Sequence, residues 1–154
     1  MSVVPENMQA QITVSGTEQD SDPFDSKLSF AVIYTSLDAT ITALKKAEIL
    51  ASRLHGRVDL IVTQVVPYPL PLNRPPVSLK FCRRRLRAIS SDSPVETTVR
   101  LFLCRDQLAT LKRVLRPHSL VVVGGRGRWW ALGEKCLARR LRRAGHDVIF
   151  TETE

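Results

Sequence analysis

Short apolar runs alternate along this chain with segments in which apolar residues recur every three or four positions. The runs are rich in β-branched residues and are typical of buried strands, whereas steps of three and four place side chains on one face of a helix. The runs predict strands at residues 30–34, 58–66, 95–103, 119–123 and 147–151. The periodic segments predict helices at residues 41–54, 78–90, 106–115 and 131–144, with Asp38 or Thr40 capping the first.

This alternation of strands and helices indicates an α/β domain with a parallel sheet. Each connection between strands is long enough for a helix, and such crossovers cover both faces of the sheet. Ligands of these sheets bind beyond the carboxyl ends of the strands, at the point where the strand order reverses. The loops after Tyr34, Val66, Leu103 and Val123 are therefore the candidate site.

The first 27 residues differ from the rest of the chain in being polar and almost without periodicity. We expect residues 1–27 to be a disordered acidic N-terminal extension and residues 28–154 to be the folded domain. Residues 11–14 alternate enough to form a short strand, which we expect only on the surface of a partner.

Composition narrows the class of protein. Apolar residues make up 44% of the chain, as in globular proteins, and no apolar run reaches the length of a membrane-spanning helix. The N-terminus does not resemble a secretion signal, so we expect a cytoplasmic protein. The three cysteines, Cys82, Cys104 and Cys136, are widely spaced, which predicts free thiols rather than disulfides. The sequence has no cluster of Cys and His residues, so it does not predict a metal site.

Charge is distributed unevenly. The whole chain has a net charge of +8, but residues 1–28 carry five acidic residues and one lysine, whereas the remainder carries 22 Lys or Arg and 10 Asp or Glu. Two of the predicted helices carry a run of basic residues, one at residues 80–87 and the other at residues 135–143. These two arginine-rich helices are either solvated faces or a surface for an anionic partner: nucleic acid, anionic lipid or an acidic protein. Aromatic residues are not interleaved with the arginines, which argues against specific base recognition.

The segment from Ser119 to Arg128 is the most informative for function. Its apolar strand runs into Gly124-Gly125-Arg126-Gly127-Arg128, and a predicted helix follows. A strand, a glycine loop and a helix N-terminus together form the usual anion site of α/β proteins, because backbone N–H groups and the helix dipole converge there. The same glycines are also explained by a simple turn between strand and helix.

The order of elements and three local matches resemble the universal stress protein family. Residues 119–128 resemble that family's terminal strand and phosphate loop, residues 30–51 its first strand and helix, and residues 147–151 its last strand. The resemblance implies a five-stranded parallel sheet in the order 3-2-1-4-5 with helices on both faces, of the type also found in adenine-nucleotide alpha-hydrolases. It also implies homodimers that pair through the last strand, and a family divided between members that bind ATP and members that do not.

The departures from the ATP-binding pattern fall in the expected pocket. Gly124 and Gly127 match the first half of the family's Gly-x2-Gly-x9-Gly-Ser/Thr motif, but Leu137 stands at the third glycine, and nearby Gly133 is followed by Glu134 instead of a hydroxyl residue. The family's acidic residue at the end of the first strand aligns with Thr35. In favour of a nucleotide, Arg126 and Arg128 could neutralise phosphates and the tryptophans at 129 and 130 could stack on a base.

We therefore expect a non-catalytic regulatory or stress-response protein with a degenerate nucleotide pocket. An ATP-binding switch with slow or no hydrolysis is the first alternative, with ATP as the candidate cofactor. A basic adaptor for nucleic acid or an acidic protein is the second. The spacing of residues predicts no catalytic group. The candidate pocket residues are Tyr34, Thr35, Ser36, Asp38, Val66, Gly124, Gly125, Arg126, Gly127, Arg128, Gly133 and Glu134.

Overall fold

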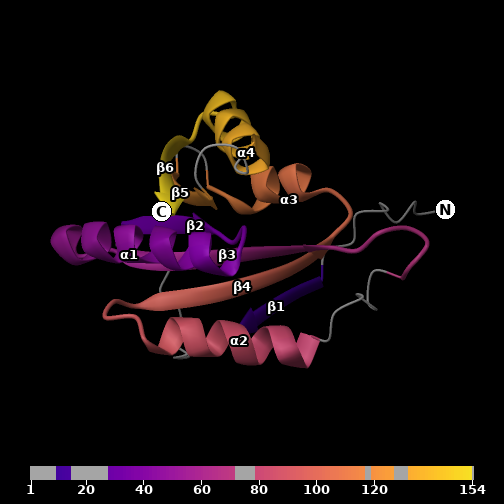
Figure 1. Cartoon of the computed structure of the whole chain (residues 1–154), viewed down its shortest axis with the longest axis horizontal. Coiled ribbons are helices and arrows are strands. Elements are labelled where there is room, and N and C mark those ends of the chain that lie inside the picture. Colours follow the sequence, from indigo (N-terminus) through magenta and orange to yellow (C-terminus); the bar gives the residue numbers. More distant parts are fainter. Residues whose placement is uncertain (1–9, 15–27, 72–78, 117–118, 127–131, 154) are drawn as a thin grey trace.

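The computed structural model describes residues 10–14, 28–71, 79–116, 119–126 and 132–153. Within these ranges, strands and helices alternate after an initial strand, and all strands belong to one sheet (Figure 1). The elements in chain order are β1 (Ala10–Val14), β2 (Ser29–Ile33), α1 (Leu37–Leu54), β3 (Arg57–Val65), α2 (Leu79–Ser91), β4 (Thr97–Cys104), α3 (Gln107–Val114), β5 (Leu120–Arg126), α4 (Leu132–Arg143) and β6 (Asp147–Thr153).

The sheet has the predicted topology with one strand added. Its order is β1-β4-β3-β2-β5-β6. The five neighbouring strands other than β1 all pair in parallel. Counted from β2, those five strands have the order 3-2-1-4-5, so the predicted fold is confirmed. The order reverses between β2 and its neighbours β3 and β5, which places the switch point at the carboxyl end of β2.

The added strand corrects the expectation for residues 10–14. β1 pairs antiparallel with β4 in the chain's own sheet, from Ala10 opposite Leu103 to Val14 opposite Val99, and not on a partner's surface as expected. The physical reason is that the outer edge of β4 presents unpaired backbone groups, and the nearest alternating segment in the chain can satisfy them. The rest of the predicted extension lies outside the described residues.

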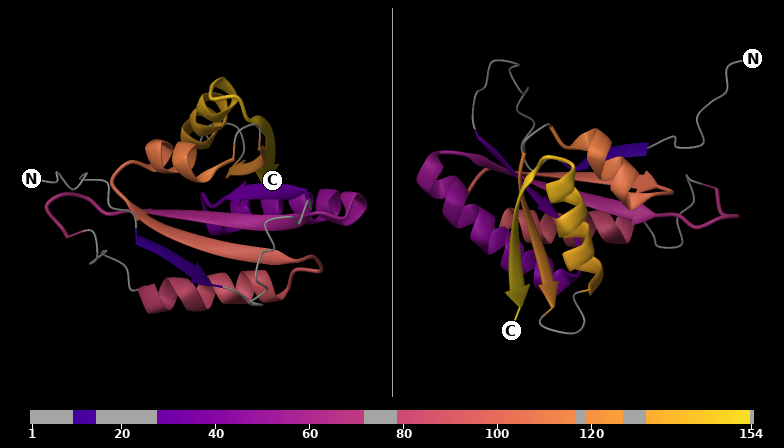
Figure 2. Two further views of the ribbon diagram at one scale, coloured as in Figure 1. Left: turned by 180° about the vertical axis from the view of Figure 1, so that it is seen from behind. Right: turned by 90° about the horizontal axis from the view of Figure 1, so that it is seen from above.

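The two faces of the sheet carry separate cores, because successive residues of a strand point to opposite sides. Phe30 and Val32 of β2 belong to the core under α1 and α2, and Ala31 and Ile33 belong to the core under α3 and α4. In the right view of Figure 2, α1 and α4 lie on opposite sides of β5 and β6. The helices therefore cover both faces, and the carboxyl edge of the sheet lies between the two layers.

Two element boundaries differ from prediction in ways that affect the site. The helix α1 is capped by Ser36, whose hydroxyl accepts a hydrogen bond from the Ala39 N–H at 3.4 Å, and not by Asp38 or Thr40. The Thr40 hydroxyl instead accepts from the Thr35 N–H at 3.1 Å. The strand β5 continues through Gly124 and Gly125 to Arg126, which were expected in a glycine loop. They stay in the sheet because β6 runs alongside and pairs with them.

Candidate functional site

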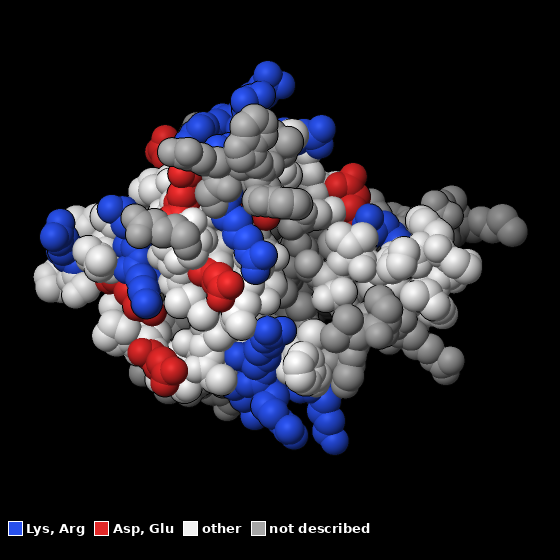
Figure 3. All heavy atoms as spheres, viewed as in Figure 1, with Lys and Arg blue, Asp and Glu red and all other residues white. Residues whose placement is uncertain are grey.

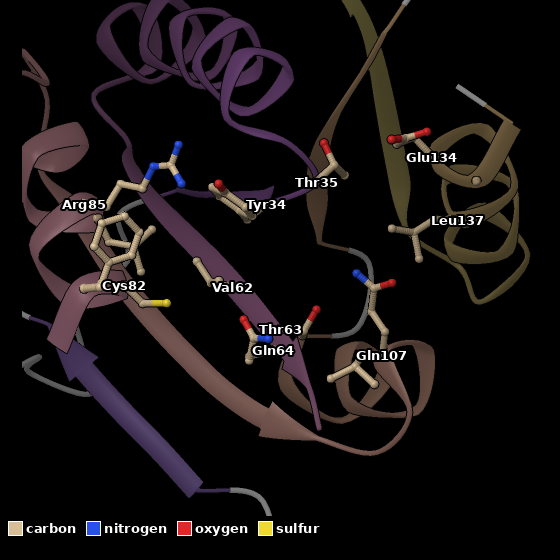
Figure 4. Close-up of a pocket in the computed structure, with 14 residues that line it drawn as sticks. Tyr34, Thr35, Val62, Thr63, Gln64, Cys82, Arg85, Gln107, Glu134 and Leu137 are labelled. Atoms are coloured by element: carbon tan, nitrogen blue, oxygen red, sulfur yellow. The ribbon is translucent and has the colours of Figure 1, made fainter. Parts of the chain in front are cut away.

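A cavity of about 560 Å³ opens at the carboxyl edge of the sheet, at the switch point. Tyr34 and Thr35 lie at the end of β2, and the last residues of β3, from Val62 to Val65, cross the cavity (Figure 4). The helix α2 forms one side, and the amino-terminal residues of α3 and α4 form the other. Its volume is in the range of small-molecule sites.

The polar groups of the cavity are spread over its walls. Arg85 of α2 lines one side, and Glu134 of α4 lines the opposite side (Figure 4). Gln64 and Gln107 add amide groups between them, and the Thr63 Oγ1 is shielded from solvent without a hydrogen-bond partner in the described residues. An unpaired buried hydroxyl costs free energy unless a ligand or water satisfies it. The walls thus suit a small ligand with several hydrogen-bonding groups and little net charge.

The apolar part of the wall comes mostly from residues that also serve the cores. It includes Phe81, Leu86, Val62 and Leu137, of which Phe81 is largely exposed at the rim. Among the described lining residues there is one thiol, Cys82, and no histidine. No group in the described parts of the chain has the three or more His, Cys, Asp or Glu side chains that would hold a metal ion. The described part of the wall therefore offers hydrogen-bonding groups and one thiol.

Four of the predicted site residues line this cavity: Tyr34, Thr35, Gly133 and Glu134. Gly133 lies in the first turn of α4, where an added Cβ would meet no atom within 4 Å. Glu134 follows in the same turn, where its negative charge is favourable for the helix dipole. The residue that should bind phosphate by analogy with the family therefore presents a carboxylate to the cavity.

Gly124 of β5 lets α1 lie close against the sheet. A Cβ on Gly124 would lie 2.1 Å from the Ala39 carbonyl oxygen and 2.7 Å from its carbon, so only glycine lets α1 approach β5 this closely. The Gly124 carbonyl accepts a hydrogen bond from the Thr35 hydroxyl at 2.8 Å, and the Gly125 carbonyl accepts one from Thr153 at 3.1 Å. The close approach of Ala39 thus accounts for the glycine at 124, and both residues are held in the sheet by β6.

Three further predicted residues lie beside the cavity without lining it. Ser36 caps α1, as described above. Asp38, in the first turn of α1, pairs with Arg126 at the end of β5, with 3.5 Å between carboxylate and guanidinium. Both side chains are more than 60% exposed, so solvent screens this pair strongly. Arg126, the candidate for phosphate neutralisation in the ATP-binding alternative, has a carboxylate as its neighbour.

Val66 is buried, and its backbone is used by the chain itself. Its N–H donates to the Cys104 carbonyl at 2.9 Å, and its carbonyl accepts from Arg105 at 2.7 Å. Arg105 also donates to the Leu70 carbonyl at 2.8 Å and lies over the Tyr68 ring, 4.1 Å from its centroid. This arginine therefore ties the segment after β3 to the end of β4.

The remaining candidates, Gly127 and Arg128, lie outside the described residues, as do the tryptophans at 129 and 130. Sequence reasoning missed the other ten lining residues. Four of these ten carry a hydroxyl, amide or guanidinium group: Thr63, Gln64, Arg85 and Gln107. Thr63 and Gln64 end a predicted strand on the ligand-binding edge, and Gln107 begins the helix after the next strand, so their positions were available as signals. Arg85 was one of many arginines on a predicted helix, and nothing local distinguished it.

Comparison with known proteins supports the fold. No protein-family model matches the chain, and no curated protein matches it. Among solved structures, the chain is similar to a protein from the universal stress protein family of Burkholderia pseudomallei, with a TM-score of 0.56 and 22% sequence identity. The match covers 83% of this chain and 98% of that one. No helix in the described parts of the chain is long and apolar enough to span a membrane.

Proposed function

We propose that this chain is a non-catalytic regulatory protein of the universal-stress-protein type, acting in a stress response, whose nucleotide pocket is degenerate. The observation that carries the proposal is that the described part of the expected phosphate loop, residues 124–126, is strand. Gly124, Gly125 and Arg126 are part of β5 and pair with residues 151–153 of β6. Backbone that is paired within the sheet is not free to wrap around a triphosphate.

The charges around the cavity support the same proposal. Glu134 faces the cavity from the first turn of α4, and Arg126 is beside Asp38. A triphosphate carries several negative charges, and it would meet a carboxylate where it needs a hydrogen-bond donor. A ligand with less charge, such as a nucleoside or another small polar molecule, would avoid this repulsion and still use Arg85, Gln64 and Gln107.

A thermal-shift titration tests the proposal directly. If ATP bound with a Kd of about 50 μM, a concentration of about 5 mM with Mg²⁺ would stabilise the protein by about 2.7 kcal/mol. For a chain of this size, that corresponds to a rise in Tm of roughly 5–11 °C. We expect a change below about 1 °C, and a rise in the calculated range would refute the degenerate pocket in favour of the ATP-binding switch.

A pair of variants isolates the role of the carboxylate. Glu134→Ser removes the charge and restores a hydroxyl next to Gly133, whereas Glu134→Asp keeps the charge. We expect ATP to stabilise the serine variant more than the wild type, with no gain for the aspartate variant. Equal responses of the two variants would show that Glu134 does not exclude the triphosphate.

We further propose a cytoplasmic homodimer that pairs through β6. β1 covers the outer edge of β4, whereas β6 pairs with β5 alone among the described strands. An open edge strand is a natural site for pairing with a second copy. Cys82, Cys104 and Cys136 are unpaired, which supports a reducing compartment. Light scattering should give twice the chain mass of 17.3 kDa, and a monomer would contradict the proposed dimer.

A further inference from the structure

The carboxyl ends of α3 and α4 lie together at the edge of the molecule opposite the cavity. Both helices pack on the same face of the sheet (Figures 1 and 2). Each helix leads into the start of a strand, and those starts are adjacent, since the Asp147 N–H donates to the Ser119 carbonyl at 3.1 Å. Both helices therefore end at the amino edge of the sheet, before two neighbouring strands.

The amino edge of the sheet at α3 and α4 is strongly basic. Figure 3 shows Lys and Arg side chains gathered over the top of the molecule, where α4 lies. We call the following exposed side chains the basic end: Lys112, Arg113, Arg116, Arg139, Arg140 and Arg143. None of the six is in an ion pair between described residues; the pairs found there are Lys135 with Glu152 and Arg126 with Asp38. Among the described residues, the charge of the basic end is therefore not neutralised by a neighbouring carboxylate.

Folding alone does not explain such a concentration of charge. One or two cations in the last turn of a helix are favourable because they complement the helix dipole. Further cations repel one another, as Arg139 and Arg143 do at a spacing of four residues on α4. The acidic residue that begins β6 at this edge, Asp147, is a single opposing charge. An anion bound across the two helices would relieve the repulsion.

The surroundings of the basic end indicate the class of anion. The large apolar side chains that are exposed in the described structure lie outside α3 and α4; they are Leu28, Ile49, Leu54, Val65, Tyr68, Leu70 and Phe81. Binding of single strands relies on aromatic side chains that stack on bases, and membrane surfaces need apolar side chains that insert. Among the described residues, α3 and α4 themselves carry neither an exposed aromatic nor an exposed large aliphatic side chain. Guanidinium groups bind phosphates in a bidentate manner, and several cations spread over two helices match the closely spaced phosphates of a duplex.

We propose that the basic end binds a double-stranded nucleic acid through its phosphate backbone, without sequence preference. A duplex carries a negative charge for about every 1.7 Å of its axis, so the cations of two adjacent helices can contact several phosphates at once. The surface differs from the one expected from the sequence. The arginines of α2 lie on the opposite face of the sheet from those of α4, so the two arginine-rich helices cannot form one surface, and α3 takes the place of α2.

The test measures binding of the full chain to a fluorescent DNA duplex of about 24 base pairs by anisotropy, at several salt concentrations. Four phosphate contacts predict a slope of log K against log salt of about −3.6, which is about a hundredfold loss of affinity between roughly 50 and 200 mM NaCl. The triple variant Arg139→Gln, Arg140→Gln, Arg143→Gln should weaken binding at least tenfold and reduce the slope by about 2 to 3.

The matched control removes the same charge from the other face. Lys80→Gln, Arg84→Gln, Arg87→Gln neutralises three exposed cations of α2 and should change affinity less than threefold. A second variant of the basic end, Lys112→Gln, Arg113→Gln, Arg116→Gln, should behave like the α4 variant, and it covers the case in which that variant fails to fold.

Several results would overturn the proposal. Equal losses in the α2 and α4 variants would assign binding to net charge and not to the basic end. Affinity that does not change with salt would exclude phosphate contacts. Tighter binding to a single strand of the same length, or binding to phosphatidylserine vesicles without binding to the duplex, would assign the surface to a different partner.

Discussion

Gly124→Ala should be among the most destabilising single-methyl changes in this protein. The new Cβ would lie 2.1 Å from the carbonyl oxygen of Ala39, and the carbonyl carbon would be 2.7 Å away. Both are backbone atoms of the first turn of α1, so no side chain can rotate to make room. To reach an ordinary contact of 3.4 Å, α1 and β5 would have to move apart by about 1.3 Å.

The size of the effect follows from what α1 covers. This helix packs on β2, β3, β5 and β6, so a shift at its amino end loosens the centre of the core that holds Phe30 and Val32. Overpacking of a filled core costs typically 1–3 kcal/mol, and a backbone obstacle places this case at the upper end, about 3 kcal/mol. The Thr35 hydrogen bond to the Gly124 carbonyl would be strained as well.

Gly133→Ala is the matched control. It adds the same methyl group to another glycine at the same edge of the sheet, but this Cβ would meet nothing within 4 Å. Because alanine is favoured over glycine in a helix, the change should be neutral or stabilising by up to about 1 kcal/mol. Urea unfolding followed by circular dichroism gives both values from the midpoints, provided the slopes agree. Wild-type stability for Gly124→Ala, or a larger loss for Gly133→Ala, would refute the close-approach argument.

Two further outcomes follow from the loops around the site. Arg105→Ala should lower the free energy of unfolding by about 1 kcal/mol, because the hydrogen bonds to the Val66 and Leu70 carbonyls are lost and solvent replaces them only in part. Amide hydrogen exchange should become faster in the segment after β3. Unchanged exchange in that segment would contradict the role of Arg105. Burial raises the pKa of the Cys104 thiol; the Asp106 carboxylate raises it further, and a hydrogen bond with the Thr110 side chain lowers it. At mildly alkaline pH, iodoacetamide should therefore modify the exposed Cys136 well before the buried Cys104. Because the unfolded chain then ionises first, this thiol should lower the free energy of unfolding as the pH rises above about 9. Equal alkylation rates for the two cysteines would contradict this environment.

A site residue could be predicted from the sequence where its place follows from its position at the end of a strand or the start of a helix. Tyr34, Thr35, Gly133 and Glu134 were predicted and do line the cavity, because each follows a strand or begins a helix at a known edge of a parallel sheet. Arg85 was not predicted, since its position depends on how α2 packs across the sheet. Asp38 and Arg126 were both assigned to the site, but their pairing needed their relative positions in space.

The sequence by itself determined the order of strands and helices, because apolar periodicity is a local property and each element must bury its own apolar face. It also determined the parallel topology, since long helical crossovers leave few other arrangements. The tertiary structure alone decided the role of the glycine segment, the pairing of β1 with β4, and the separation of the two arginine-rich helices. The physical reason is distance along the chain: Ala39 and Gly124 touch only after folding, and no local pattern records a contact between residues so far apart.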